Sequence, residues 1–217
     1  MRNSECWYIN ICHDTCDKCL TFLQMNWQME HSGLPKAKQR VISLDLNKNN
    51  LCDKDAFHRL ADIKKNIVEF VAEGKNLFIC SNYTGNGKTS WAIKLLHSYF
   101  HHTAAGNYDN LKGMFVSTTE LLLKLKDFNN PVSQKYINQL KEVDLVIWDD
   151  VAISGISAYD LTQLYSIIDH RVLAEKANVF TSNQTDVETL TDLIGSRLAS
   201  RIYYTSEIIE LKGKDMR

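Results

Sequence analysis

Proline, net charge and long apolar runs are scarce in this chain. Its 217 residues include two prolines, Pro35 and Pro131, and each falls where we expect one element to end and another to begin. The net charge of -1 has no marked excess of either sign, so overall charge does not indicate nucleic-acid binding and leaves only a local basic surface open. No apolar run approaches the ~20 residues of a membrane span, and the N-terminus lacks the apolar core of a signal peptide. These absences predict a cytoplasmic protein without membrane contact.

The bulk composition is that of a globular protein. Hydrophobic residues make up 44% of the chain and charged residues 24%, both ordinary fractions. The length is sufficient for one sizeable core with a small appendage.

Cysteines are concentrated at the N-terminus. Four of the six lie in the first twenty residues: Cys6, Cys12, Cys16 and Cys19. In a cytosolic protein such clustering indicates a metal before a disulfide, and the Cys16-x-x-Cys19 spacing lets one turn grip a tetrahedral Zn²⁺. Cys6 and Cys12 could supply the other half, and His13 could replace one ligand. The alternative is a cluster of reduced thiols in a small helical segment, while redox catalysis is disfavoured because no thioredoxin-like pattern surrounds the pair.

A helical pattern follows the cysteines. Leu20, Leu23 and Trp27 fall on one stripe, which we interpret as a packing face or a contact with a partner helix. The Ser-Gly-Leu-Pro sequence at 32–35 ends this pattern. We therefore predict a cysteine-rich segment over residues 1–34 and a main domain over residues 35–217.

The main domain alternates predicted strands and helices, which is typical of an α/β fold with a parallel sheet. The helical pattern that begins at Asp53 could be capped by Asp53 or Asp55. We expect strands over 77–80, 113–117, 143–148, 178–183 and 208–211, and helices over 53–70, 88–101, 119–126, 133–140, 159–172 and from 186 onward.

The first of these strands leads into a glycine-containing loop. Gly85 and Gly87 precede Lys88 and Thr89, which open a helical pattern. Strand, glycine loop, Gly-Lys-Thr and helix together indicate a phosphate-binding loop, in which backbone N–H groups and the helix N-terminus hold phosphates. Lys88 would reach the β- and γ-phosphates of ATP, and the Thr89 hydroxyl would ligate Mg²⁺. The predicted nucleotide contacts are Thr84, Gly85, Asn86, Gly87, Lys88, Thr89 and Ser90.

One position departs from the usual loop pattern. Asn82 stands where a glycine is expected, five residues before Gly87. Asparagine tolerates left-handed backbone geometry better than most residues, so we expect the turn to survive. The alternative is a glycine-rich turn that binds nothing.

Two acids end another buried strand. Asp149 and Asp150 follow the apolar run 145–148, some 60 residues after the Gly-Lys-Thr loop. Carboxylates at the carboxyl edge of a parallel strand face the place where α/β proteins bind ligands. Asp149 would orient Mg²⁺, and Asp150 could polarise an attacking water.

Polar residues later in the chain complete the predicted site. Asn183 ends the strand 178–183, where its amide could position a water, although asparagine also commonly begins turns. Arg197 and Arg201 share one helical face; they could be surface charges, or they could reach the phosphate of a neighbouring subunit.

Two further features have functional and structural interpretations. The helix–break–helix over 119–141 carries Lys135, Tyr136 and Lys141, which could contact a nucleic-acid strand or could lie on a solvated surface. His101-His102 looks like a metal pair, but its place at a helix end favours a solvated cap.

Together these motifs resemble the AAA+ ATPases, and within them the DnaC/DnaI-type replicative helicase loaders of bacteria and phages. The resemblance covers about residues 32–217 and rests on the nucleotide loop 85–89, the acidic pair, the strand ending at Asn183 and the arginine-finger-like box 194–201. It implies a three-layer P-loop NTPase core of the ASCE type, with Asn183 as sensor 1, Arg201 as the arginine finger and Arg197 as its helper. Asp150 stands where many relatives carry glutamate, and Arg217 is a weak candidate for sensor 2.

The resemblance also implies a function. We expect a Mg²⁺-dependent ATPase, slow without partners, that forms homo-oligomers with ATP at subunit interfaces and loads a DnaB-type hexameric helicase onto single-stranded DNA. The cysteine-rich N-terminus resembles small zinc-bearing, helicase-binding domains, and its brevity suggests a phage-encoded version. The alternatives are an IstB-type transposition helper and a nucleotide-gated DNA-binding adaptor with little hydrolysis. A small P-loop kinase is disfavoured because no arginine-bearing lid or acceptor pocket is recognisable.

Overall fold

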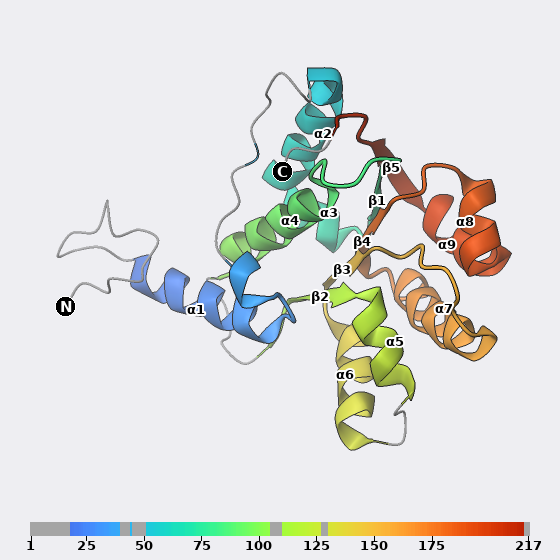
Figure 1. Ribbon diagram of the computed structural model, residues 1–217. Coiled ribbons are helices and arrows are strands. Elements are labelled where there is room, and N and C mark those ends of the chain that lie inside the picture. Colours follow the sequence, from blue (N-terminus) through green and yellow to red (C-terminus); the bar gives the residue numbers. More distant parts are fainter. Residues whose placement is uncertain (1–17, 40–43, 45–50, 105–109, 127–129, 215–217) are drawn as a thin grey trace.

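A parallel sheet of five strands forms the centre of the molecule (Figure 1). The computed structural model describes residues 18–39, 44, 51–104, 110–126 and 130–214. The strands lie in the order β2-β3-β4-β1-β5, so that β3 and β1, which end in the predicted functional segments, both flank β4. All five predicted strands are present, with the bounds β1 (Asn76–Cys80), β2 (Gly113–Ser117), β3 (Leu145–Asp149), β4 (Ala177–Ser182) and β5 (Ser206–Glu210).

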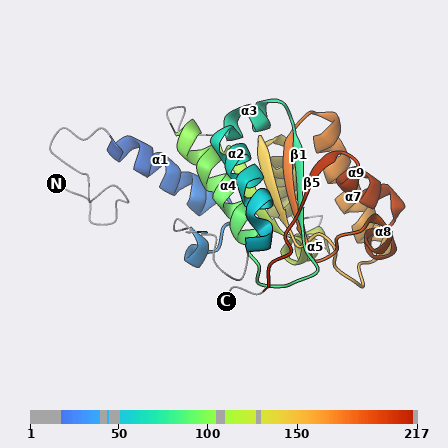
Figure 2. The same cartoon turned by 90° about the horizontal axis from the view of Figure 1, so that it is seen from above.

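The helices cover both faces of the sheet, and the predicted three-layer α/β architecture is confirmed (Figure 2). A hydrophobic core lies on each face of the sheet, and alternate residues of a strand pack into the two cores. Leu77 and Ile79 of β1 pack into one core, and Phe78 and Cys80 pack into the other. One layer holds α1 (Lys18–His31), α2 (Lys54–Lys65), α3 (Ile67–Ala72) and α4 (Lys88–Thr103); the other holds α5 (Thr118–Lys126), α6 (Pro131–Glu142), α7 (Ala158–Leu173), α8 (Val187–Ile194) and α9 (Ser196–Tyr203).

Two short 3₁₀ turns, η2 (Lys36–Lys38) and η3 (Leu51–Asp53), flank the connection from α1 to α2. None of the helices within the described ranges is long and apolar enough to cross a membrane.

Helix α1 packs into the main core through a different stripe from the one the sequence suggested. Met25 and Met29 are buried in the core cluster of α2, α3 and α4, whereas Leu20 and Leu23 are 62% and 52% exposed. The carbonyl of Ser32 accepts a hydrogen bond from the Phe115 N–H, which ties the end of α1 to the edge of β2. The predicted boundary at residue 34 stays a prediction. The predicted zinc ligands Cys6, Cys12 and Cys16, and the side chain of Cys19, lie outside the described residues.

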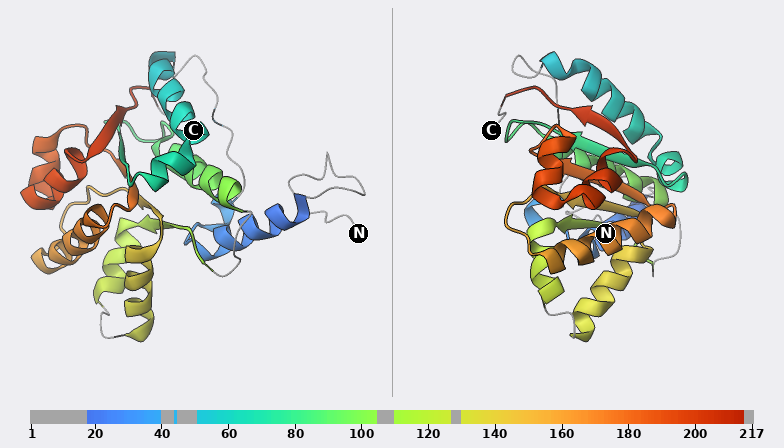
Figure 3. Two further views of the ribbon diagram at one scale, coloured as in Figure 1. Left: turned by 180° about the vertical axis from the view of Figure 1, so that it is seen from behind. Right: turned by 90° about the vertical axis from the view of Figure 1, so that its right-hand side faces the viewer.

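The helical segment after Asp53 differs from the prediction in two respects. It is divided at Asn66 into α2 and α3. The Asp53 side chain does not cap α2; its two oxygens instead accept hydrogen bonds from the backbone N–H groups of Lys212 and Gly213, at 2.6 and 2.9 Å. The interpretation as a helix cap was wrong because a partner 159 residues away in sequence competes for this carboxylate. Figure 3 shows α2 beside β5, which leads into that partner segment.

A buried arginine holds the amino ends of β3 and β4. Arg171 of α7 is fully buried and donates hydrogen bonds to the carbonyls of Leu140, Val143 and Ala177, all within 2.8 Å. Its Nε donates to Oδ1 of Asn178, which also accepts from the indole N–H of Trp148. Burial lowers the pKa of Arg171 to about 9, because the cation has lost its water. This residue is a structural support far from the carboxyl edge where the motifs meet.

Candidate nucleotide-binding site

The loop between β1 and α4 has the backbone of an anion cradle. Gly85 and Gly87 adopt left-handed conformations, with φ of 72° and 99°, which glycine reaches without steric cost. Gly87 is the N-cap of α4, so the unpaired N–H groups of the first helical turn face the loop. Asn82 does not have a positive φ. The tolerance of asparagine for left-handed geometry is therefore not what preserves this turn. Its side chain instead accepts a hydrogen bond from Thr185, at 3.2 Å, in the segment that follows β4.

Lys88 is buried within this loop. Its ammonium donates hydrogen bonds to the carbonyl of Tyr83 at 2.6 Å and to Oδ1 of Asn86 at 3.2 Å. Burial lowers the pKa of Lys88, and the carboxylates of Asp150 and Asp149 act in the opposite direction. Both acceptors are neutral, so the cation has no ion pair in its own loop, and a phosphate would be a stronger partner.

Thr89 and Asp149 meet as a set of oxygen ligands. The Thr89 hydroxyl donates to Oδ1 of Asp149 at 2.7 Å, and the Thr181 hydroxyl donates to the same oxygen at 2.8 Å. A hydroxyl and a carboxylate in contact, beside an anion cradle, fit Mg²⁺, which takes few protein oxygens and completes its shell with phosphate and water. The predicted magnesium ligands, Thr89 of α4 and Asp149 of β3, therefore lie in direct contact.

Asp150 lies beside this set in an unusual backbone conformation. Its φ is 56°, the left-handed region that asparagine and aspartate enter more readily than other non-glycine residues. Its N–H donates to the Thr181 hydroxyl at 2.9 Å, and its Oδ1 accepts from Nδ2 of Asn183 at 3.4 Å. Burial and the adjacent Asp149 raise the pKa of Asp150, while Lys88 lowers it. A carboxylate held this way can accept a proton or orient a water.

The two arginines lie elsewhere on the molecule. Arg197 and Arg201 line an open pocket of about 400 Å³ on α9, together with hydroxyl-bearing side chains from α7 and α9. Nε of Arg201 lies 2.6 Å from Oδ1 of Asp169, and a hydrogen bond with Tyr165, together with this charge, raises the pKa of Arg201. Arg197 is exposed. Among the described residues, neither arginine makes a hydrogen bond or ion pair with the phosphate loop.

Thr181 is the functional residue that sequence reasoning missed. It is 2% exposed and bridges both acids, as acceptor from one and donor to the other. Its position offered a signal: Thr181 lies near the carboxyl end of β4, two residues before Asn183, which follows the strand. The pairing of Trp148 with Phe180 then places Thr181 beside Asp149.

The histidine pair is a helix end, as the sequence favoured. Nδ1 of His102 makes a 2.8 Å hydrogen bond with the carbonyl of Ser98, one turn earlier in α4. Within the described ranges, no cluster of three or more histidine, cysteine or acidic side chains could hold a metal ion.

Comparison with known proteins agrees with this geometry. A model of the family described as IstB-like ATP binding protein matches residues 21–217. The replicative helicase loader DnaC of Buchnera aphidicola subsp. Baizongia pistaciae is 25% identical over 184 residues, which cover 82% of this chain and 61% of that protein. The chain thus spans less than two thirds of the length of that relative.

Solved structures share the fold. A crystal structure of the DnaC helicase loader superposes with a TM-score of 0.69 at 19% identity, covering 82% of this chain and all of that one. A crystal structure of DnaI gives 0.61 at 23% identity, covering 85% and 94%. At these identities the likeness shows the fold alone, an α/β AAA+ P-loop fold built on a five-stranded parallel sheet.

Proposed function

Because the chain belongs to the IstB-like ATP-binding protein family, we propose that it is a Mg²⁺-dependent ATPase that loads a replicative DNA helicase onto single-stranded DNA. One observation carries the ATPase part. The Lys88 ammonium, the Thr89–Asp149 oxygen pair and the Asp150–Asn183 pair meet at the carboxyl edge of β1, β3 and β4, beside the N-terminus of α4. This is the edge where open α/β sheets bind their ligands.

Each residue has one task in the proposed reaction. Lys88 leaves its neutral acceptors to pair with the β- and γ-phosphates, while the backbone of Gly85 and Gly87 lets N–H groups approach them. Thr89 and Asp149 would hold Mg²⁺, and the metal would supply charge neutralisation on the phosphate oxygens. Asp150 and Asn183 position the attacking water, with Asp150 as the proton acceptor.

A neighbouring subunit completes the site in this proposal. Neither arginine on α9 contacts its own loop, so a second copy would have to supply the cation at the γ-phosphate. We propose Arg201 as this finger and Arg197 as its helper. Arg201 must then exchange its Asp169 partner for phosphate, whereas Arg197 is already exposed. Hydrolysis should be slow in a monomer, and a monomer that turned over at full rate despite Arg201→Ala would contradict the proposal.

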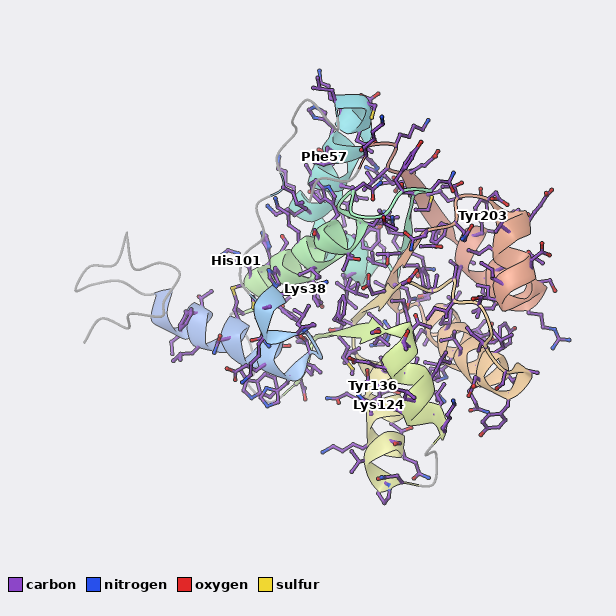
Figure 4. The ribbon with its side chains drawn as sticks, in the orientation of Figure 1. Lys38, Phe57, His101, Lys124, Tyr136 and Tyr203 are labelled. Carbon is purple, nitrogen blue, oxygen red and sulfur yellow. The ribbon has the colours of Figure 1, made fainter. Side chains whose placement is uncertain are left out.

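The pair of helices α5 and α6 is the proposed contact with single-stranded DNA. Lys124 of α5 lies over the ring of Tyr136 of α6, 3.9 Å from the ring centroid (Figure 4). Lys126 and Lys135 are also exposed on these helices. Exposed cations on two neighbouring helices suit the phosphate backbone of a single strand. Lys135→Ala should weaken binding of a fluorescent oligonucleotide and reduce its salt dependence, whereas Lys65→Ala, on the opposite layer, should not.

The remaining parts of the proposal concern the N-terminus and origin. We propose that residues 1–34 bind the helicase, with Cys6, Cys12, Cys16 and Cys19 holding zinc, and that the protein is phage-encoded and acts in the bacterial cytoplasm. Zinc measured in purified protein tests the ligand set. Helicase binding by a zinc-free protein would contradict a role for zinc in the contact with the helicase.

A transposition helper is the second candidate, because the matching family is named for IstB. The deciding experiment measures ATP hydrolysis with and without single-stranded DNA and a DnaB-type helicase, for the protein and for Lys88→Ala. We expect single-stranded DNA and the helicase to raise the rate of ATP hydrolysis by the unmodified protein, and to have no effect on Lys88→Ala. In a parallel pull-down, retention of a transposase instead of the helicase would favour the second candidate. Hydrolysis that stays negligible under every condition, with ATP bound, would favour a nucleotide-gated adaptor.

A further inference from the structure

The second asparagine of the phosphate loop is buried and fully hydrogen-bonded. Asn86 is 1% exposed. Its Nδ2 donates to the Ser81 hydroxyl at 2.6 Å and to the carbonyl of Leu211 at 3.2 Å, and its Oδ1 accepts from the Lys88 ammonium at 3.2 Å. One side chain therefore joins the cation of the loop to the segment that follows β5.

That segment is fixed on its other side by Asp53. The Lys212 N–H donates to one oxygen of this buried carboxylate and the Gly213 N–H to the other, at 2.6 and 2.9 Å. The Leu211 N–H continues the sheet by donating to the Cys80 carbonyl at 2.9 Å. Residues 211–213 thus lie between the phosphate loop and the start of α2.

A single peptide group connects the two attachments. The carbonyl of Leu211, which accepts from Asn86, and the N–H of Lys212, which donates to Asp53, belong to the same planar amide. Hydrogen bonds in such a chain polarise one another in the same direction, from the Lys88 cation to the Asp53 anion. A change at one end therefore weakens or strengthens the bond at the other.

We propose that Asn86 is a positioning residue that couples nucleotide occupancy to the segment 211–213. This inference rests on the proposed function, since ATP is what draws the Lys88 ammonium away from Asn86. Without the cation, the amide of Asn86 donates less strongly, and the bond between the 211–212 peptide and Asp53 loosens. Because coupling between sites is reciprocal, the Asp53 attachment in turn opposes nucleotide binding.

The coupling predicts a change in hydrogen exchange that a purely structural asparagine would not produce. Saturating Mg²⁺ and a non-hydrolysable ATP analogue should speed exchange of the Lys212 and Gly213 amides several-fold in the full chain. Asn86→Leu should exchange fast in both states and lose the response, with analogue binding verified by calorimetry. Asn82→Ala is the matched control: it removes the other loop asparagine, whose partner is Thr185, and should keep the response.

A second variant keeps the inference testable if Asn86→Leu does not fold. Asp53→Asn weakens the attachment without touching the loop, and it should raise affinity for the analogue several-fold. Unchanged or lower affinity in Asp53→Asn would overturn the coupling. So would unchanged exchange at residues 212 and 213 in an unmodified protein that binds the analogue. Failure of the unmodified protein to bind any nucleotide would overturn the proposed function as well.

Discussion

Replacing Thr181 by valine isolates the contribution of one hydroxyl to the arrangement of both acids. Valine keeps the shape and the β-branch, but it removes the donor to Asp149 and the acceptor for the Asp150 N–H. A hydrogen bond to an ionised carboxylate contributes about 1.5–3 kcal/mol, and an unpaired backbone N–H costs about 1 kcal/mol where water can partly reach it, as at the part-buried N–H of Asp150. We therefore expect Thr181→Val to lower the free energy of unfolding by about 3 kcal/mol.

The same substitution should separate turnover from binding. The contacts of Lys88 and the loop do not involve Thr181, so the KM for ATP should change little. Thr89 and Asp149 would both hold Mg²⁺, and the Thr181 hydroxyl would then be the side-chain donor that still fixes the orientation of Asp149. A carboxylate free to shift should lower kcat about 100-fold. Thr181→Ser, which keeps the hydroxyl, is the control. Urea unfolding and steady-state kinetics check both numbers; turnover near that of the unmodified protein in Thr181→Val, or an equal loss in Thr181→Ser, would refute the reasoning.

Three further predictions concern the loop, the buried arginine and pH. Lys88→Ala should abolish ATP binding in calorimetry, whereas Asn82→Gly should leave affinity nearly unchanged; equal behaviour would mean the loop register is wrong. Arg171→Met should cost at least ~4 kcal/mol in urea unfolding, because several buried carbonyls lose their donor, with Arg171→Lys less severe. The acid limb of the kcat profile should lie above the ordinary aspartate range, because burial and Asp149 raise the pKa of Asp150, and Asp149→Asn should lower it. The sign for stability is opposite: a raised carboxyl pKa stabilises the fold below about pH 4 and loses that contribution as pH rises through the folded-state pKa.

The features that could be predicted from the sequence are those formed by residues adjacent in the chain. The phosphate loop could be predicted from Gly85 to Thr89, because such a loop needs glycines, a lysine and a hydroxyl-bearing residue in direct succession. The parallel strands were predictable for a similar reason, since strands buried on both faces read as continuous apolar runs. Asp149 and Asp150 followed from the end of such a run.

Other contacts join residues that are distant in sequence, and no local pattern announces them. Asp53 and Asp55 are the two candidate helix caps that the sequence offers, because aspartate is a favoured capping residue at the start of a helix. The backbone N–H groups that donate to the Asp53 carboxylate are 159 and 160 residues away, and only the structure shows that they bind it in place of the helix N-terminus. Asn86 is predicted from the sequence only as a nucleotide contact, although its side chain reaches across 125 residues to Leu211. The sequence does not mark Arg171 as buried, since arginine in an amphipathic helix is usually exposed.

The left-handed backbone at Asp150 bears on whether the short acid can serve in hydrolysis. Aspartate holds its carboxylate about one methylene nearer the backbone than glutamate, which favours an adaptor that binds ATP without turning it over. However, the conformation at φ 56° re-aims the side chain, and the carboxylate meets Asn183 at 3.4 Å. Such a conformation costs of order 1 kcal/mol, and here the Thr181 hydroxyl holds the Asp150 N–H that fixes it. Three features therefore favour hydrolysis over the adaptor: the strained backbone at Asp150, the Thr181 hydroxyl that stabilises it, and the Asn183 amide that donates to the carboxylate.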